Sequence, residues 1–287
     1  MTAVLALLTS LMWGLADFGG GLLTRRTSAL TVVVVSQVLA AAALAAVVVA
    51  TGGWTHVGPH LWYAAAAGVV GPLGMLAFYR ALALGPMGVV SPLGALGGVA
   101  VPIGVALILG ERPGWLQGVG VVVALVGVGL ACGPRLGAPV ARQTLLLTLV
   151  AALGFGSVMA LIEHASHTVP GLFLALLVQR VLNVAVGGTA LLVQAGRGAW
   201  QMPEGGLRGL RPALPALALV GLADVAANGT YVLAAQYGPV TVAAVLASLY
   251  PVVTALAARG MLRERMRTVQ TAGAGLALMG TVLLATG

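Results

Sequence analysis

The chain has 287 residues, of which 60% are hydrophobic and only 7% are charged. Soluble domains carry about 25% charged residues, so this composition excludes a sizeable soluble domain and indicates a polytopic membrane protein. The formal net charge is +8 and every basic residue is arginine, but the arginines lie one to four at a time between apolar runs. This spread argues against a nucleic-acid-binding patch and is typical of loops that orient a chain in a membrane.

Apolar runs of about 20 residues follow one another along the chain. Because lipid satisfies no backbone hydrogen bonds, each run is expected to be a transmembrane helix. The ten predicted helices cover residues 2–23, 29–50, 60–83, 87–109, 115–133, 143–164, 170–194, 211–236, 239–260 and 268–286. The first run has no basic start and no small-residue cleavage site, so we expect a retained helix rather than a signal peptide. The single cysteine, Cys132, excludes an intramolecular disulfide.

The second half of the sequence repeats the first. A shift of 153 residues places Gly85-Pro86 on Gly238-Pro239, Glu111-Arg112 on Glu264-Arg265 and Gly127 on Gly280. For the first two helices of each half the shift is 142 residues, which places Trp13 on Phe155 and Gln37 on Gln179. The difference of eleven residues is assigned to the loop at about 195–210.

These shifts predict two domains of five helices each, residues 1–137 and residues 138–287. Because five is odd, the second domain must insert upside down relative to the first. Inverted repeats of this kind build many secondary transporters, and their substrate site lies near the bilayer midplane between the repeats.

Three stretches resemble one known family. They are SLMWGLADFGGGLLTRR (10–26), FYRALALGPMGVVSPLGALGGVAVPIGVALILGERPGWLQGVGVVVALVGVGL (78–130) and SLYPVVTALAARGMLRERMRTVQTAGAGLALMGTVLL (248–284). Their order and spacing are similar to those of EamA-type transporters of the drug/metabolite superfamily, including bacterial exporters of aromatic amino acids. The resemblance implies ten helices around a central cavity, alternating access without ATP, and a small-metabolite substrate, often an amino acid leaving the cell. The family also moves sugars, nucleotide sugars and cationic drugs, so fold alone does not decide the substrate.

The arginines predict the orientation of the chain. Twelve of them fall in or near the loops that follow odd-numbered helices, whereas Arg112 lies on the opposite side and Arg180 lies within a helix. The positive-inside rule then places both termini outside the cytoplasm. The resemblance to EamA-type transporters implies the opposite orientation, because many of them have both termini in the cytoplasm.

Ionisable and polar residues inside the predicted helices are the candidate site residues. An ionisable group at the centre of a span costs about 2.5–3.5 kcal/mol on insertion scales, so such groups usually face a cavity or a partner. Asp17 lies one turn after Trp13, and two further polar stripes occupy the seventh and eighth helices. The proposed cavity residues are Trp13, Asp17, Phe155, Gln179, Arg180, Asn183, Asp224, Asn228 and Tyr231.

Within this set, Arg180 is a candidate for holding a substrate carboxylate. Asp17 or Asp224 would hold an ammonium group or carry a proton, and the aromatic residues would form the wall. The alternative is that one of the two acids only neutralises Arg180 and fixes helix packing. Gln37 and Gln179 are expected to be interhelical hydrogen-bond partners.

Four residues are candidates for gating. Tyr79 and Arg80 lie near the end of the third helix, although Arg80 would also reach the interface as an ordinary snorkelling side chain. Pro92 and Pro251 are expected to bend the fourth and ninth helices, which the repeat relates to each other. Such bent helices would be the rocking elements.

The sequence predicts a secondary transporter rather than an enzyme. It has no HExxH motif and no phosphate-binding loop, and its four histidines have no convincing metal-ligand spacing, so no cofactor is expected. We expect an inner-membrane exporter of small metabolites, most of all amino acids, that works in the lipid bilayer without nucleic acid and for which a monomer is sufficient. The alternatives are uptake of sugars or other small solutes and efflux of cationic drugs, followed by a channel or an intramembrane enzyme.

Overall fold

The computed structural model describes residues 1–24, 27–84, 87–131, 141–166, 168–198, 206–262 and 267–286. Helices follow one another throughout these ranges, and no strand occurs in them. They are α1 (Thr2–Leu23), α2 (Ala29–Thr51), η1 (Gly53–His56), α3 (Leu61–Leu84), α4 (Met87–Ile108), α5 (Trp115–Ala131), α6 (Arg142–Glu163), α7 (Val169–Gly196), η2 (Gly206–Ala213), α8 (Leu214–Tyr237), α9 (Val240–Ala247), α10 (Tyr250–Leu262) and α11 (Thr268–Thr286).

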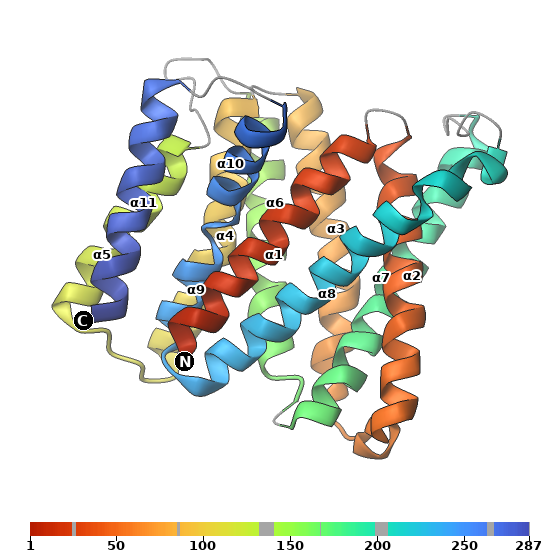
Figure 1. Ribbon diagram of the computed structural model, residues 1–287, viewed down its shortest axis with the longest axis horizontal. Coiled ribbons are helices and arrows are strands. Elements are labelled where there is room, and N and C mark those ends of the chain that lie inside the picture. Colours follow the sequence, from red (N-terminus) through yellow and green to blue (C-terminus); the bar gives the residue numbers. More distant parts are fainter. Residues whose placement is uncertain are drawn as a thin grey trace.

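The predicted all-helical polytopic architecture is confirmed. Six of the described helices are long and apolar enough to cross a membrane, and shorter apolar helices lie beside them in the same bundle (Figure 1). The observed helices begin and end within a few residues of the ten predicted spans, with α9 and α10 together occupying the ninth. The protein is therefore an integral multi-pass membrane protein.

The sequence predicts the ninth span as one bent helix, and the structure differs from this prediction. It is broken between Ala247, where α9 ends, and Tyr250, where α10 begins. Pro251 has no backbone N–H to donate to the preceding turn, so it is tolerated as the second residue of a new helix but not inside a continuous one. The equivalent helix of the first half, α4, runs unbroken from Met87 to Ile108.

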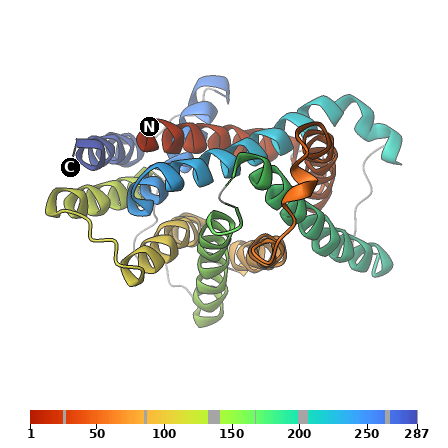
Figure 2. The same cartoon turned by 90° about the horizontal axis from the view of Figure 1, so that it is seen from below.

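The helices pack in pairs that recur five spans further along the chain. The packing of α3 on α6 recurs as α8 on α1, and that of α4 on α6 recurs as α9 and α10 on α1. Likewise α3 packs on α7 as α8 packs on α2. Three contacts, α2 with α7, α4 with α9 and α5 with α11, join a span to its own equivalent. Helices α5 and α11 stand together at one end of the bundle (Figures 1 and 2).

Small residues allow the closest of these contacts. A Cβ on Gly127 of α5 would collide with the backbone of Ala277 in α11, and a Cβ on Gly280 of α11 would collide with the backbone of Ala124 in α5. Without a hydrophobic driving force between helices in lipid, close backbone approach of this kind supplies the packing energy.

The two edges of the bundle differ in what they carry. The ends of α1, α3 and α7 lie at one edge, and both termini lie at the opposite edge (Figure 1). Arg80 and Arg197, near the ends of α3 and α7, are exposed, as is Arg211 just before α8. The loops after odd-numbered spans therefore share one side, as the sequence predicts.

Candidate functional site

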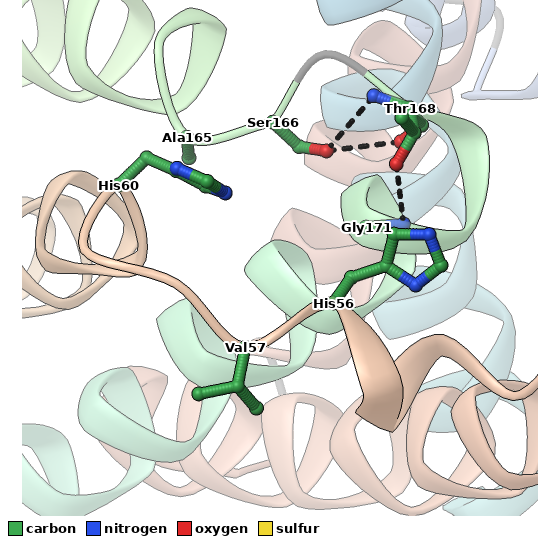
Figure 3. A pocket seen from close by; sticks show the side chains of 7 residues that line it. All are labelled: His56, Val57, His60, Ala165, Ser166, Thr168 and Gly171. Atoms are coloured by element: carbon green, nitrogen blue, oxygen red, sulfur yellow. Dashed lines mark hydrogen bonds between the residues drawn. The ribbon is translucent and has the colours of Figure 1, made fainter.

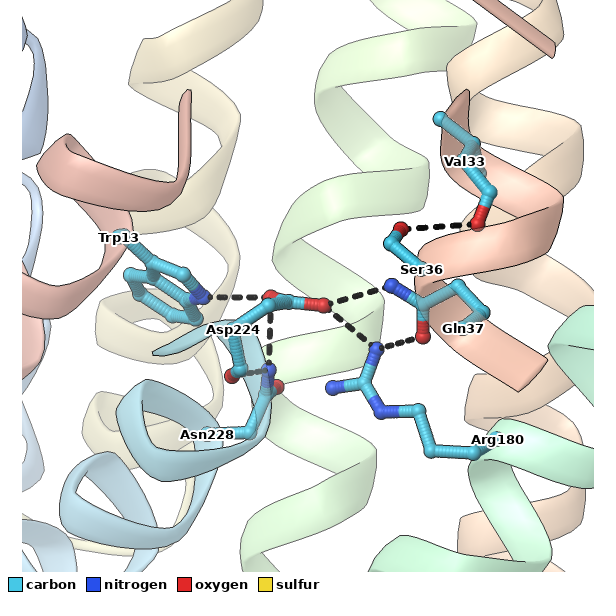
Figure 4. A network of polar contacts seen from close by, with 7 residues as sticks. All are labelled: Trp13, Val33, Ser36, Gln37, Arg180, Asp224 and Asn228. Atoms are coloured by element: carbon cyan, nitrogen blue, oxygen red, sulfur yellow. Dashed lines mark hydrogen bonds and ion pairs between the residues drawn. The ribbon is translucent and has the colours of Figure 1, made fainter. Parts of the chain in front are cut away.

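The carboxylate of Asp224, near the middle of α8, receives hydrogen bonds from four side chains (Figure 4). Its Oδ1 accepts from Trp13 Nε1 of α1 at 3.0 Å and from Asn228 Nδ2 at 3.2 Å. Its Oδ2 accepts from Gln37 Nε2 of α2 at 2.9 Å and from Arg180 Nη1 of α7 at 2.6 Å. Four helices, two from each half of the chain, therefore meet at one carboxylate.

Glycines bring these helices close enough to meet. A Cβ on Gly221, one turn before Asp224, would collide with the backbone of Ser36, so α8 approaches α2 next to Gln37. Gly14, beside Trp13, lies so close to α10 that its Cβ would stand 2.6 Å from Cγ1 of Val253. Helix geometry alone places Asn228 next to Asp224, because residues four apart on a helix share a face.

Arg180 and Asp224 form an ion pair inside the bundle. The side chain of Arg180 is 3% exposed and that of Asp224 is 24% exposed. Nη1 of Arg180 also donates to Oε1 of Gln37 at 2.6 Å, so Gln37 bridges the two charged groups. Gln37 is therefore the interhelical hydrogen-bond partner that the sequence predicts, and of the two candidate acids it is Asp224 that neutralises Arg180.

Asp17 is placed differently from Asp224. It lies one turn after Trp13 on α1, its side chain is exposed, and it accepts no hydrogen bond from the described residues. Its helix, α1, packs against α8, which carries Asp224. Of the two candidate acids, Asp224 is therefore bound by four donors, whereas Asp17 accepts no hydrogen bond from a described residue.

The candidate aromatic residues stand in two separate groups. Trp13 packs against Tyr231 with ring centroids 6.3 Å apart and against Tyr250 of α10 with centroids 6.0 Å apart. Phe155 instead packs against Phe78, with centroids 5.6 Å apart. Tyr231 is fully buried, so in this conformation it supports Trp13 rather than lining an open surface.

The repeat relates these two groups. A shift of 142 residues carries Trp13 onto Phe155, and a shift of 153 carries Phe78 onto Tyr231 and Gly71 onto Asp224. The same arrangement therefore occurs twice, once with only apolar side chains and glycine and once with Trp, Tyr and Asp. The polar cluster belongs to one of the two equivalent places only.

Gln179 and Asn183, on the same helix as Arg180, remain without hydrogen-bond partners for part of their side chains. Oε1 of Gln179 and Oδ1 of Asn183 are buried and accept no hydrogen bond within the described part of the chain. The expected interhelical bond of Gln179 is therefore not seen at this oxygen. The backbone of Gln179 instead lies against Gly68 of α3, whose Cβ would stand 2.6 Å from its carbonyl oxygen.

The gating candidates are placed in part. Arg80 is exposed near the end of α3, and Pro251 immediately follows the break between α9 and α10. The side chains of Tyr79 and Pro92 lie outside the described part of the structure. Tyr250, which the sequence analysis missed, contacts Trp13, and its position directly before Pro251 was the signal available for it.

A separate cavity of about 280 Å³ is lined by none of the residues of the polar cluster (Figure 3). It is lined by His56, Val57, His60, Ala165, Ser166, Thr168 and Gly171. Oγ of Ser166 donates to the carbonyl oxygen of Thr168 and accepts from its N–H group. Oγ1 of Thr168 accepts from the N–H group of Gly171 and so caps the start of α7. No group of three or more metal-ligating side chains occurs among the described residues.

Two comparisons with known proteins identify the family and the fold. The family model for EamA-like transporters matches the chain twice, at residues 1–132 and at residues 142–286. Together the two matches cover nearly all of the chain. The chain belongs to the EamA-like transporter family. This membership makes it a small-solute transporter of the drug/metabolite superfamily.

A protein of known crystal structure is similar at 17% identity over 99% of this chain and 98% of its own, with a TM-score of 0.73. At this identity the likeness shows a shared EamA-like fold and no more. None of the curated proteins matches the chain.

Proposed function

We propose that this EamA-like transporter exports amino acids, aromatic ones among them, across the inner membrane by alternating access. The observation that carries the proposal is the polar cluster at Asp224, built by two helices from each half of the chain. Buried ionisable groups within membrane spans mark substrate or ion pathways because they are otherwise too costly to keep.

The packing pattern supports alternating access by two inverted repeats, residues 1–137 and 138–287. The contacts of α3 and α4 with α6 and of α3 with α7 recur five spans along the chain, as we expect for two equivalent halves of opposite orientation. In transporters of this kind the substrate site lies between the repeats near the bilayer midplane. Trp13 and Gln37 come from the first half and Arg180 and Asp224 from the second, so the cluster joins the two.

The charges of the cluster favour a zwitterion over a sugar. A sugar site needs many neutral hydrogen-bonding groups, whereas here a guanidinium and two carboxylates dominate. Asp17, exposed and without a hydrogen bond from the described residues, is the group best placed to receive an ammonium. Trp13 beside it offers an aromatic face for a cation or an aromatic side chain.

The first test is counterflow in proteoliposomes. Vesicles loaded with excess unlabelled phenylalanine are mixed with labelled phenylalanine, and its entry is compared with that into protein-free liposomes. Entry above this control supports an amino-acid transporter. If labelled phenylalanine does not enter while glucose or a quaternary ammonium compound does, the amino-acid assignment is wrong and the corresponding alternative replaces it.

The orientation is tested separately. We propose that both termini and the loops after even-numbered spans are extracytoplasmic, because the arginines lie on the other side. In a Cys132→Ser background, Thr55→Cys should react with an impermeant maleimide in intact cells and Thr24→Cys should not. Both residues are exposed, so accessibility depends on the side of the membrane. The reverse labelling would place the termini in the cytoplasm.

Energy coupling is assigned to Asp17 rather than to Asp224. Asp224 is held by four donors, so taking up a proton there would break the hydrogen bond from Arg180 or its neighbours. Asp17→Asn is expected to abolish pH-driven accumulation of phenylalanine and, because it also removes the charge opposite the ammonium group, to weaken downhill counterflow without abolishing it. Unchanged pH dependence in this variant would remove Asp17 as the proton carrier.

A further inference from the structure

The guanidinium of Arg180 has one occupied and one unoccupied edge. Nη1 donates to Oε1 of Gln37 and to Oδ2 of Asp224, both at 2.6 Å. Nε and Nη2 are buried and donate to no acceptor within the described residues. Figure 4 shows Nη1 directed at Asp224 and Gln37, with the second terminal nitrogen on the side of Asn228.

An arginine in such a place normally uses all its donors. It carries five N–H groups in a rigid plane and cannot lose its charge, and buried polar groups are as a rule hydrogen-bonded. Here the N–H groups of Nε and Nη2 have lost their hydrogen bonds to water without a replacement. Two buried oxygens on the same helix, Oε1 of Gln179 and Oδ1 of Asn183, also lack partners. Neither of them therefore accepts a hydrogen bond from Nε or Nη2 of Arg180.

Asp224 cannot serve the unoccupied edge either. Both of its oxygens are already used, Oδ1 by Trp13 and Asn228 and Oδ2 by Gln37 and Arg180. Turning toward Nε would break these bonds. The ion pair therefore fixes the orientation of the guanidinium through Nη1 and leaves Nε and Nη2 for another anion.

We propose that the Nε–Nη2 edge of Arg180 is the subsite for the carboxylate of the transported solute. This inference rests on the proposed function, which it deepens by naming the chemical group that is recognised. The N–H groups of Nε and Nη2 point in parallel from one edge and match the two oxygens of a carboxylate, which a lysine ammonium does not. Gln37 and Asp224 are positioning residues, because they act on the solute only by orienting Arg180.

The subsite is covered in this structure. Arg180 is 3% exposed, whereas Asp224 beside it is 24% exposed. The carboxylate therefore binds in a conformation that uncovers the edge, and alternating access between the two halves supplies one. Solutes that lack a carboxylate gain nothing at this edge and leave its donors unpaired, so they are rejected.

Counterflow of labelled phenylalanine tests the proposal with three competitors: phenylalanine, 3-phenylpropionate, which keeps the carboxylate and lacks the amine, and phenethylamine, which keeps the amine and lacks the carboxylate. In the wild-type protein, phenethylamine should compete at least tenfold less well than 3-phenylpropionate. The test variant is Arg180→Lys, which keeps a cation opposite Asp224 and removes the paired donors. It should weaken competition by phenylalanine and by 3-phenylpropionate at least tenfold, and it should change competition by phenethylamine less than threefold. Arg112→Lys, the same substitution in the exposed loop between α4 and α5, should change none of them.

Two results would overturn the proposal. One is equal competition by phenethylamine and 3-phenylpropionate in the wild-type protein, which needs no variant to fold. The other is a uniform weakening of all three competitors by Arg180→Lys. If phenylalanine shows no counterflow at all, the amino-acid function has failed, and the subsite is decided by thermal melting of the purified protein. A rise in melting temperature with 3-phenylpropionate and not with phenethylamine supports the carboxylate subsite, and no such difference rejects it.

Discussion

The ion pair between Arg180 and Asp224 makes a quantitative prediction for a double-mutant cycle. In Asp224→Leu the buried guanidinium loses its counter-ion, and breaking a buried pair from one side costs about 3–5 kcal/mol. Because Asp224 is 24% exposed, water would compensate in part, and we expect a cost near the lower end, about 3 kcal/mol. Arg180→Met should cost a similar amount for the converse reason.

The double variant should then cost little more than either single one, because it leaves no unpaired charge. The coupling energy between the two positions should therefore be about 3 kcal/mol, well above the average of about 0.6 kcal/mol for hydrogen bonds between membrane helices. The measurement is equilibrium unfolding in mixed detergent micelles, followed by tryptophan fluorescence.

A neutral pair that also joins α8 to a neighbouring helix is the matched control. Thr9 of α1 and Thr230 of α8 lie with their hydroxyl oxygens 2.9 Å apart. The cycle of Thr9→Val and Thr230→Val should give a coupling of about 0.6 kcal/mol. If the charged cycle gives no more than the threonine cycle, Arg180 and Asp224 are solvated independently and the buried ion pair is refuted.

Three further predictions follow from close contacts and exposure. Gly127→Leu should lower the melting temperature markedly because its side chain meets the backbone of α11, whereas Gly129→Leu, with nothing within 4 Å of its Cβ, should change it little. Gly14→Val should destabilise the contact of α1 with α10 and abolish counterflow, and Gly21→Val, which faces open space, should do neither. Asp17→Asn should leave the melting temperature within about one degree and yet reduce transport, because this exposed carboxylate accepts no hydrogen bond from the described residues. An equal loss of stability in Asp17→Asn and Asp224→Asn would mean that Asp17 is a structural group after all.

The positions of the helices were predictable because a membrane leaves few choices. A span needs about 20 apolar residues, and the charges, prolines and glycines between spans are easily seen. The break in the ninth span was not predictable in the same way. Pro251 signals that a helix cannot continue unchanged, but a bend and a new helix start are both compatible with one proline.

The charged members of the polar cluster could be picked out from the sequence, whereas their connections could not. The cost of burying charge singles out Arg180 and Asp224 wherever they point. Which acid meets the arginine depends on how α8 packs against both α2 and α7, and Gly221 lies against Ser36 where α8 meets α2. Asp17 and Asp224 are therefore equivalent candidates in the sequence and distinct in the structure.

The contact of α5 with α11 has a consequence for the architecture as a whole. Gly127 and Gly280 are equivalent under the shift of 153 residues, and each lies against the backbone of the other's helix. Gly127 meets Ala277, the counterpart of Ala124, and Ala124 meets Gly280, the counterpart of Gly127. Such reciprocal pairing is the defining property of an isologous interface between the subunits of a twofold dimer. Within this single chain, α5 and α11 therefore meet as two identical subunits would, except that the two halves are covalently joined.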